Sequence, residues 1–115
     1  MTKIHTRYNY VRTCRRKSGL SQRELALVLG YRDQWQVSRH ERSQSKPTLR
    51  TALAYEVVFR MPTAEIFVDL LKAVEQSVEV NLAVLELRLQ GRSGNKRHAR
   101  LTAQKLQWLA ERRHP

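Results

Sequence analysis

The sequence predicts an all-α protein, and three observations support this fold class. No segment alternates apolar and polar residues as a half-buried strand does. Only three Pro and four Gly interrupt the 115 residues, so most of the chain is free to be helical. Residues 63–90 repeat apolar side chains at steps of three and four, the spacing of one helix face. At this length we expect one core with a helical appendage.

The first helix is expected over about residues 8–17, after six frayed residues. Val11 and Cys14 are three apart and face the core, and Ser18 with Gly19 ends the helix. The thiol is best interpreted as a small buried hydrophobe. A redox or metal role would need a neighbouring ligand, and the chain holds one Cys and four scattered His.

Residues 21–30 predict a second helix with defined ends. Ser21 and Glu24 are spaced as a capping box, in which each side chain accepts a hydrogen bond from the other residue's backbone N–H. Gly30 ends the helix, because glycine adopts the left-handed C-cap conformation at least cost. The expected apolar face is Leu25, Val28 and Leu29.

A third helix has to begin almost at once. Asp33 is a suitable N-cap for it, and Val37 and His40 fall on its inner side. Two short helices joined by a tight turn have the geometry of a helix-turn-helix motif. The outer side of the third helix carries Gln34, Trp35, Ser38 and Arg39.

The residues around this motif follow a recognisable order. They are Gly19, Leu20, Ser21, Gln22, Leu25, Ala26, Leu29, Gly30, Val37, Ser38, Arg39, Glu41, Arg42 and Pro47. In this order the chain resembles the lambda-repressor-like, XRE-type helix-turn-helix family of DNA-binding domains, over about residues 11–67. The resemblance implies a five-helix DNA-binding head, followed here by a long helix and a short C-terminal helix.

The resemblance also implies roles for individual residues. Gln22 is expected to contact a phosphate and to buttress the recognition helix, where a helix N-terminus attracts anions. Arg15 and Glu41 are expected to form a structural salt bridge between the first and third helices. The stretch between Gly30 and Val37 is one residue longer than in many members of the family, so base contacts shifted by one position are the alternative.

The outer face of the third helix holds the candidate base contacts. Gln34 matches adenine N6 and N7, and Arg39 matches guanine O6 and N7, each giving about 1–3 kcal/mol of discrimination. Ser38 suits either base. Trp35 contacts a thymine methyl or the sugar–phosphate wall, or else folds over the domain surface. The candidate phosphate contacts are Gln22, Arg23, Arg42, Ser43, Gln44, Lys46 and Thr48.

A fourth helix is expected with Pro47 at its first position. Glu56 falls on its apolar stripe, where an unpaired carboxylate is costly. It therefore pairs with an arginine of a neighbouring helix, or the helix is rotated so that Glu56 lies at its wet edge. Arg60 stands where the family favours Gly at the following turn. The expected inner face is Leu49, Leu53 and Phe59.

From residue 63 the apolar pattern is longer than the head requires. It forms a coiled-coil-like seam of about six turns. On an exposed helix, a partner would have to cover this apolar seam. We expect a DNA-binding domain over residues 1–67 and a helical extension over residues 68–115 for dimerisation or partner binding. The predicted dimer seam is Val74, Val78, Leu82, Leu85 and Leu89, continuing from Phe67 and Leu71.

The helix should break at residues 91–95, which include Gly91, Gly94 and Asn95. A basic link over residues 96–100 then leads to a short helix over about residues 102–112. With Leu106 and Leu109 on one side, this helix folds back on the long one as an antiparallel hairpin. Because that apolar face is narrow, a mobile basic tail is the alternative.

The charge distribution points to nucleic acid. The chain holds 22 Lys and Arg against 10 Asp and Glu, a formal charge of +12, which favours a polyanionic partner. Residues 1–62 carry +9 (13 against 4), residues 63–90 carry −3 (2 against 5) and residues 91–115 carry +6 (7 against 1). Both ends are therefore typical of nucleic-acid surfaces, and the middle is not.

Enzymatic motifs and membrane signals are missing from the sequence. There is no nucleophile elbow, glycine-rich phosphate loop or metal-ligand spacing, so we expect no catalysis, no cofactor and no metal. No apolar run approaches the roughly 18 residues that span a bilayer. We expect a cytoplasmic protein, associated with a bacterial or phage nucleoid.

These features together predict a sequence-specific transcriptional regulator that binds a palindromic operator as a homodimer, because one head reads few base pairs. The alternative is an antitoxin-like or adaptor protein whose C-terminal helices bind a partner protein, with autoregulatory DNA binding. A non-specific nucleic-acid binder is a more distant third reading.

Overall fold

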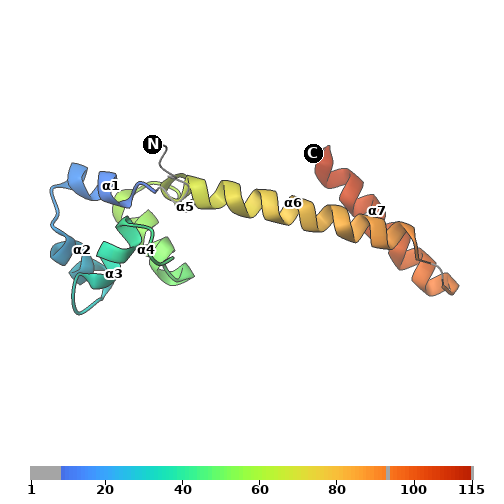
Figure 1. Cartoon of the computed structure of the whole chain (residues 1–115), viewed down its shortest axis with the longest axis horizontal. Coiled ribbons are helices and arrows are strands. Elements are labelled where there is room, and N and C mark those ends of the chain that lie inside the picture. The colour runs from blue at the N-terminus through green and yellow to red at the C-terminus, as the bar shows by residue number, and fades with distance from the viewer. Residues whose placement is uncertain (1–8, 93, 115) are drawn as a thin grey trace, which may run out of the picture. The chain divides into compact units, whose positions relative to one another are not determined.

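The computed structural model of the protein describes residues 9–92 and 94–114 (Figure 1). Over these ranges the chain forms helices and no strand, which confirms the predicted fold class. The contacts divide the chain into two units, residues 1–73 (the head) and residues 74–115 (the hairpin), and the boundary falls within α6. The seven helices are α1 (Val11–Ser18), α2 (Gln22–Leu29), α3 (Trp35–Glu41), α4 (Leu49–Phe59), α5 (Thr63–Ile66), α6 (Val68–Gln90) and α7 (Lys96–Arg113).

The first helix begins later than expected. The Asn9 side chain accepts a hydrogen bond from the Val11 N–H at 3.0 Å, and this contact keeps residues 9 and 10 outside α1. The expected frayed residues 1–6 and the expected helical residue 8 lie outside the described residues. Cys14 is buried, as predicted, and its Sγ lies 3.9 Å from Sδ of Met61.

The predicted ends of α2 are confirmed. The Ser21 hydroxyl accepts from the Glu24 N–H at 3.0 Å, and the Glu24 carboxylate accepts from the Ser21 N–H at 2.8 Å. Gly30 adopts the left-handed conformation, with φ of 88°. The predicted apolar face is wrong at Val28, whose side chain is 58% exposed; Ala26 is buried in its place, so the helix is rotated relative to the expected face.

The recognition helix α3 begins one residue later than Asp33 predicted. Gln34 occupies the N-cap position, while the Asp33 carboxylate accepts from the Trp35 N–H at 3.0 Å. Val37 and His40 are buried, which confirms the predicted inner face.

The prediction for α4 is wrong in start and in orientation. The Thr48 side chain caps the helix by accepting from the Thr51 N–H at 3.2 Å, so Pro47 precedes the cap. Leu49 and Leu53 are 74% and 49% exposed instead of buried. The helix is apolar on every side, so its periodicity does not mark an inner face. The buried residues of α4 are Thr51, Ala52 and Tyr55, with Phe59 partly buried against the core.

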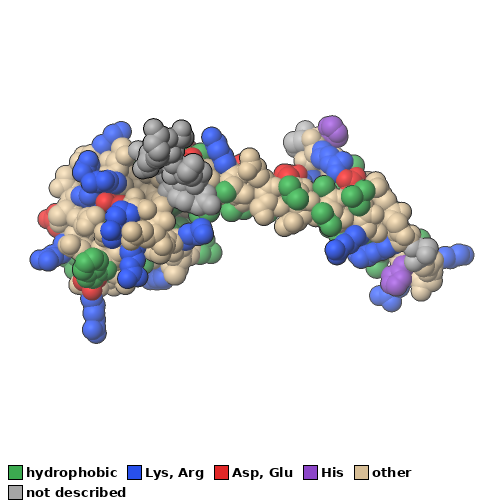
Figure 2. All heavy atoms as spheres, viewed as in Figure 1, with side chains coloured by type: hydrophobic (Ala, Val, Ile, Leu, Met, Phe, Trp, Pro, Cys, Tyr) green, Lys and Arg blue, Asp and Glu red, His purple; other side chains and the backbone are tan. Residues whose placement is uncertain are grey.

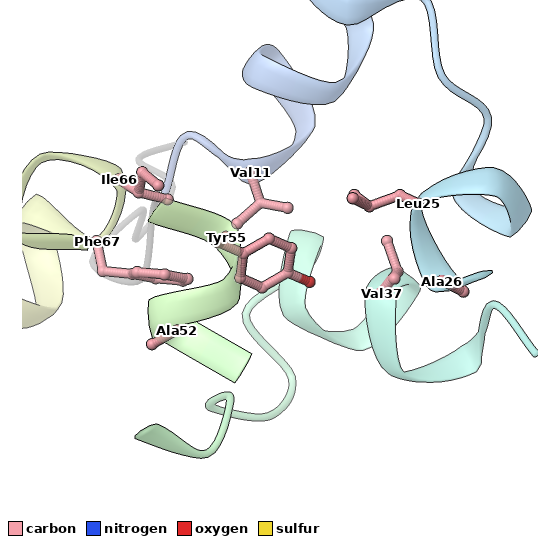
Figure 3. Close-up of a cluster of buried hydrophobic side chains, with 8 residues drawn as sticks. All are labelled: Val11, Leu25, Ala26, Val37, Ala52, Tyr55, Ile66 and Phe67. Carbon is pink, nitrogen blue, oxygen red and sulfur yellow. The ribbon is translucent and has the colours of Figure 1, made fainter. Parts of the chain in front are cut away.

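The core of the head gathers side chains from α1 to α5, with Tyr55 in its middle (Figure 3). The Tyr55 ring stacks on Phe59 at an interplanar angle of 8°, and its hydroxyl lies 2.8 Å from Nδ1 of His40. The two buried polar groups therefore satisfy each other. The core comprises Val11, Leu25, Ala26, Val37, Ala52, Tyr55, Ile66 and Phe67.

Glu56 has a partner that the sequence did not suggest. Its carboxylate accepts from the Thr63 N–H at 2.8 Å and from the Thr63 hydroxyl at 2.9 Å. The expected arginine partner is therefore wrong, and the rotated helix is the correct alternative, since Glu56 is only partly buried. Arg60 takes the left-handed conformation, with φ of 55°, at the turn where the family favours Gly.

The last helix is longer than predicted. Asn95 caps α7 by accepting from the His98 N–H at 2.9 Å, so the expected basic link forms the first turns of the helix. Arg112 pairs with Glu79 at 2.8 Å, Arg113 pairs with Glu86, and Leu89 and Leu109 are buried. These contacts fold α7 back along α6 as a hairpin rather than a mobile tail. No helix in the described part of the chain is long and apolar enough to cross a membrane.

Candidate nucleic-acid interface

The helix-turn-helix pair is held in place by a network centred on the Glu41 carboxylate. Arg15 donates to it through Nε at 2.5 Å and through Nη2 at 3.2 Å, and Gln22 donates through Nε2 at 3.0 Å. The Glu41 side chain is only 2% exposed, so the pair is protected from solvent. Arg15 also donates to the Leu20 carbonyl at 3.0 Å. Residues of α1 and α2 thus fix the C-terminal end of α3.

The network agrees with the roles that the resemblance implied for these residues. The ion pair joins Arg15 of α1 to Glu41 of α3. The Gln22 amide reaches from the first turn of α2 to α3, which is the geometry of a buttress. A phosphate contact by Gln22 stays a prediction.

One face of α3 is turned away from the core. Trp35 is 61% exposed, Arg39 is exposed and Ser38 is half-buried, while the buried Val37 and His40 occupy the opposite side. An indole this exposed does not fold over the head, which leaves Trp35 available to a partner. Three of the four candidate base contacts therefore share the outer face of α3.

The fourth candidate and two unpredicted residues flank this face. Gln34 is half-buried at the N-cap of α3, so its side chain is less available than that of Trp35. Gln36 and Arg32 are exposed beside the recognition face. The extra residue before Val37 was the sequence signal for Gln36, because a register shifted by one position replaces Trp35 with Gln36; no sequence pattern singled out Arg32.

The candidate phosphate contacts differ in whether their side chains form hydrogen bonds within the head. Arg23, Gln44 and Lys46 are exposed. The Arg42 guanidinium donates through Nε to the Ser38 carbonyl at 3.3 Å, which lays the side chain along α3. Thr48 is engaged as the cap of α4.

The loop between α3 and α4 is tied to the N-terminal segment by a residue that sequence reasoning missed. The Asn9 amide donates to the His40 carbonyl at 2.8 Å and to the Ser43 hydroxyl at 3.1 Å. Ser43 itself has φ of 57°, and the Gln44 N–H donates to the Arg39 carbonyl at 2.9 Å. No local pattern marks Asn9, because its partners lie more than thirty residues away.

Burial keeps the core side of α3 uncharged. It lowers the pKa of His40, and it raises the pKa of Tyr55, with Tyr31 and Glu41 adding to that rise. At neutral pH the pair is therefore a neutral imidazole against a neutral phenol. The positive charge of α3 lies on its exposed side, in Arg39 and in the adjoining Arg42, and blue Lys and Arg side chains are spread over the head in Figure 2.

A helix-turn-helix family model matches residues 11–73, which is more than half of the chain and includes the network and the outer face of α3. The chain belongs to this XRE-type, lambda-repressor-like helix-turn-helix family. It is therefore a DNA-binding regulator of the XRE kind. No curated protein and no solved structure matches it. Over residues 9–92 and 94–114, no group of three or more His, Cys, Asp or Glu side chains is placed to hold a metal ion.

Proposed function

We propose that this XRE-type protein is a sequence-specific transcriptional regulator that binds a palindromic operator as a homodimer through its C-terminal helices. The observation that carries the proposal is the outer face of α3. It presents Trp35 and Arg39 to solvent while the Glu41 network holds the helix from behind. A helix fixed in this way can offer side chains to the major groove in one register.

The hairpin supplies the surface for the dimer. In the predicted seam, Leu89 is buried within the hairpin, and Leu82 and Leu85 are half-buried. Val74 and Val78 remain exposed. A second apolar stripe at steps of four and three, Val80, Val84 and Leu87, is also exposed. These exposed side chains lie on two separate sides of α6, and a second copy would cover the stripe formed by Val80, Val84 and Leu87.

The first test is selection of bound sequences from random duplexes at physiological salt, using the full chain. A two-fold symmetric motif is the expected result. Arg39→Ala should relax selection at one position of each half-site, with about 1–3 kcal/mol less discrimination there, while Arg23→Ala should weaken binding evenly across sequences. If the wild-type protein enriches no motif, specific regulation is excluded.

The dimer is tested with Val80→Gln and Leu87→Gln combined, because both side chains are exposed and the hairpin does not need them for its own packing. The variant should sediment as a monomer and enrich only a half-site. The matched control is Leu53→Gln with Val57→Gln, which removes exposed apolar surface from α4 in the head. If the control dissociates the dimer instead, the dimer contact lies in the head.

An antitoxin-like or adaptor protein is the second candidate. The hairpin also exposes Leu101 and Trp108 on α7. A dimer contact through the α6 stripe would not account for this additional apolar surface. A partner protein would cover this surface. Sedimentation of the purified protein separates the two functions, because a stable dimer supports the regulator, whereas a monomer that aggregates supports the adaptor.

A further inference from the structure

The turn of the hairpin carries an uninterrupted run of positive charge. Residues 88–105 include six Lys and Arg and no Asp or Glu. All six are exposed, and Figure 2 shows blue side chains around the turn between α6 and α7. We call this surface the hairpin tip; its cations are Arg88, Arg92, Lys96, Arg97, Arg100 and Lys105.

The cations of the hairpin fall into two groups. Arg112 and Arg113, near the end of the helix, pair with Glu79 and Glu86 of α6. The six cations of the tip form no ion pair with any residue that the structure describes. Two acidic residues of α6 thus hold the far end of α7, and the tip is left with its full charge.

The placement of these cations works against the helix that carries them. Lys96 and Arg97 lie in the first turn of α7, where the helix dipole favours acidic residues and the sequence has none. Arg100 follows them at steps of four and three, spacings at which like charges repel each other. The charge therefore opposes the stability of α7, and packing within the hairpin does not account for it.

We propose that the hairpin tip binds the phosphate backbone of duplex DNA without regard to base sequence, as a second DNA contact besides the recognition helix. Arg92, Arg97 and Arg100 carry the contact. Arg92 is exposed in the turn, and Arg97 and Arg100 lie on the face of α7 opposite to Leu106 and Leu109, which point into the hairpin. Duplex DNA is the polyanion that the head of this chain already binds. The inference rests on the proposed function for its biological setting, since the tip would strengthen binding at an operator chosen by the head.

The test uses the full chain with Arg97→Gln and Arg100→Gln combined in one double variant. This variant is compared with the wild type. Affinity is measured on the selected operator and on a mixed-sequence duplex between 0.05 and 0.3 M salt. Each lost phosphate contact should reduce the slope of log K against log salt by about 0.9, so two should reduce it by about 1.8 per chain. By the same relation each bound chain should lose about 30-fold in affinity at 0.15 M salt, equally on both duplexes.

The matched control is Arg60→Gln with Lys72→Gln, which removes two exposed cations outside both DNA-contacting surfaces. Its slope should equal that of the wild type. An equal loss in control and tip variants would overturn the proposal, because net charge alone would then explain binding. An unchanged salt slope in the tip variant would also overturn the proposal. If the tip variant lost binding to anionic vesicles and kept its binding to DNA, the tip would be assigned to membranes instead.

Two further measurements distinguish a failure of the tip proposal from unfolding of the hairpin and from a failure of the proposed function. Arg92→Gln changes a residue between the two helices, and it should reduce the slope by about 0.9 with the circular dichroism unchanged. This variant decides the question if the substitutions in α7 unfold the hairpin. If the wild type prefers no operator, the proposed function fails, while the slope on mixed-sequence DNA still decides whether the tip binds phosphates.

Discussion

The head and the hairpin are both helical, but they are stabilised in different ways. The head buries eight apolar side chains from five helices in one cluster and shields its ion pair from solvent. Among the described residues of the hairpin, only Leu89 and Leu109 are buried, and both of its ion pairs are exposed or partly exposed. The head therefore has the core of an independent domain, whereas the hairpin depends on what covers its apolar faces.

Each unit contains one tryptophan, so the two can be followed separately. Trp35 lies in α3 of the head and Trp108 lies in α7 of the hairpin. In a Trp108→Phe background fluorescence reports on the head, and in a Trp35→Phe background it reports on the hairpin. If both reporters show one shared unfolding transition, the distinction between an independent head and a dependent hairpin is wrong.

The largest expected effect comes from Arg15→Met. It leaves the Glu41 carboxylate buried without its charged partner, and breaking a buried pair in this way costs about 3–5 kcal/mol. Urea denaturation followed by Trp35 should move to lower concentration, and the Trp108 transition should stay in place. Arg15→Met combined with Glu41→Met should recover part of the loss, because the isolated carboxylate is gone. No recovery would mean that the network stabilises the head by packing alone.

Leu109→Ala should have the next largest effect, confined to the hairpin. Truncating a fully buried leucine costs about 2–5 kcal/mol, and few other buried side chains remain there to offset the loss. We expect the Trp108 transition to disappear and the Trp35 transition to persist. Leu101→Ala, at an exposed position of the same helix, is the control and should change little. If Leu109→Ala unfolds the head as well, the two units are not independent.

The stability of the head should depend on pH through His40. Burial lowers its pKa in the folded state below the ordinary value near 6.5, so the unfolded chain takes up the proton first. The contribution of neutral His40 is therefore complete above about pH 6.5 and is lost as the pH falls further. Denaturation midpoints from the Trp35 reporter should decrease from pH 7 to pH 5, and His40→Gln should remove that decrease. His98→Gln, in the hairpin, should leave it unchanged.

The sequence predicted local structure best where neighbouring residues determine it. The capping box at Ser21 and Glu24 and the left-handed Gly30 depend on contacts within one helix, and the structure has them. The orientation of α4 was missed because the helix is apolar all round, so only the tertiary packing of Tyr55 selects the buried side. Asn95 at the start of α7 was a readable cap, but the cations after it were mistaken for a link.

In the candidate site, too, local features could be predicted from the sequence and contacts between distant residues could not. Val37 and His40 were placed on the core side by spacing alone, and this correctly turned Trp35 and Arg39 outward. The partner of Arg15 came from the family resemblance, since no spacing rule links residues 26 positions apart. The ties made by Asn9 were invisible for the same reason.

The smallest expected effect is a gain in the stability of the head at Arg60, where the backbone conformation is unfavourable for a residue other than glycine. The gain should appear in the head alone, which sharpens the comparison between the head and the hairpin. A non-glycine residue in the left-handed conformation costs roughly 1–2 kcal/mol, and glycine avoids this cost while losing more backbone entropy on folding. Arg60→Gly should therefore raise the free energy of unfolding of the head by up to about 1 kcal/mol, measured with the Trp35 reporter. Arg60→Ala removes the same side chain but keeps the unfavourable φ, so it should give no gain. Equal gains in the two variants would assign the effect to charge repulsion rather than to the backbone.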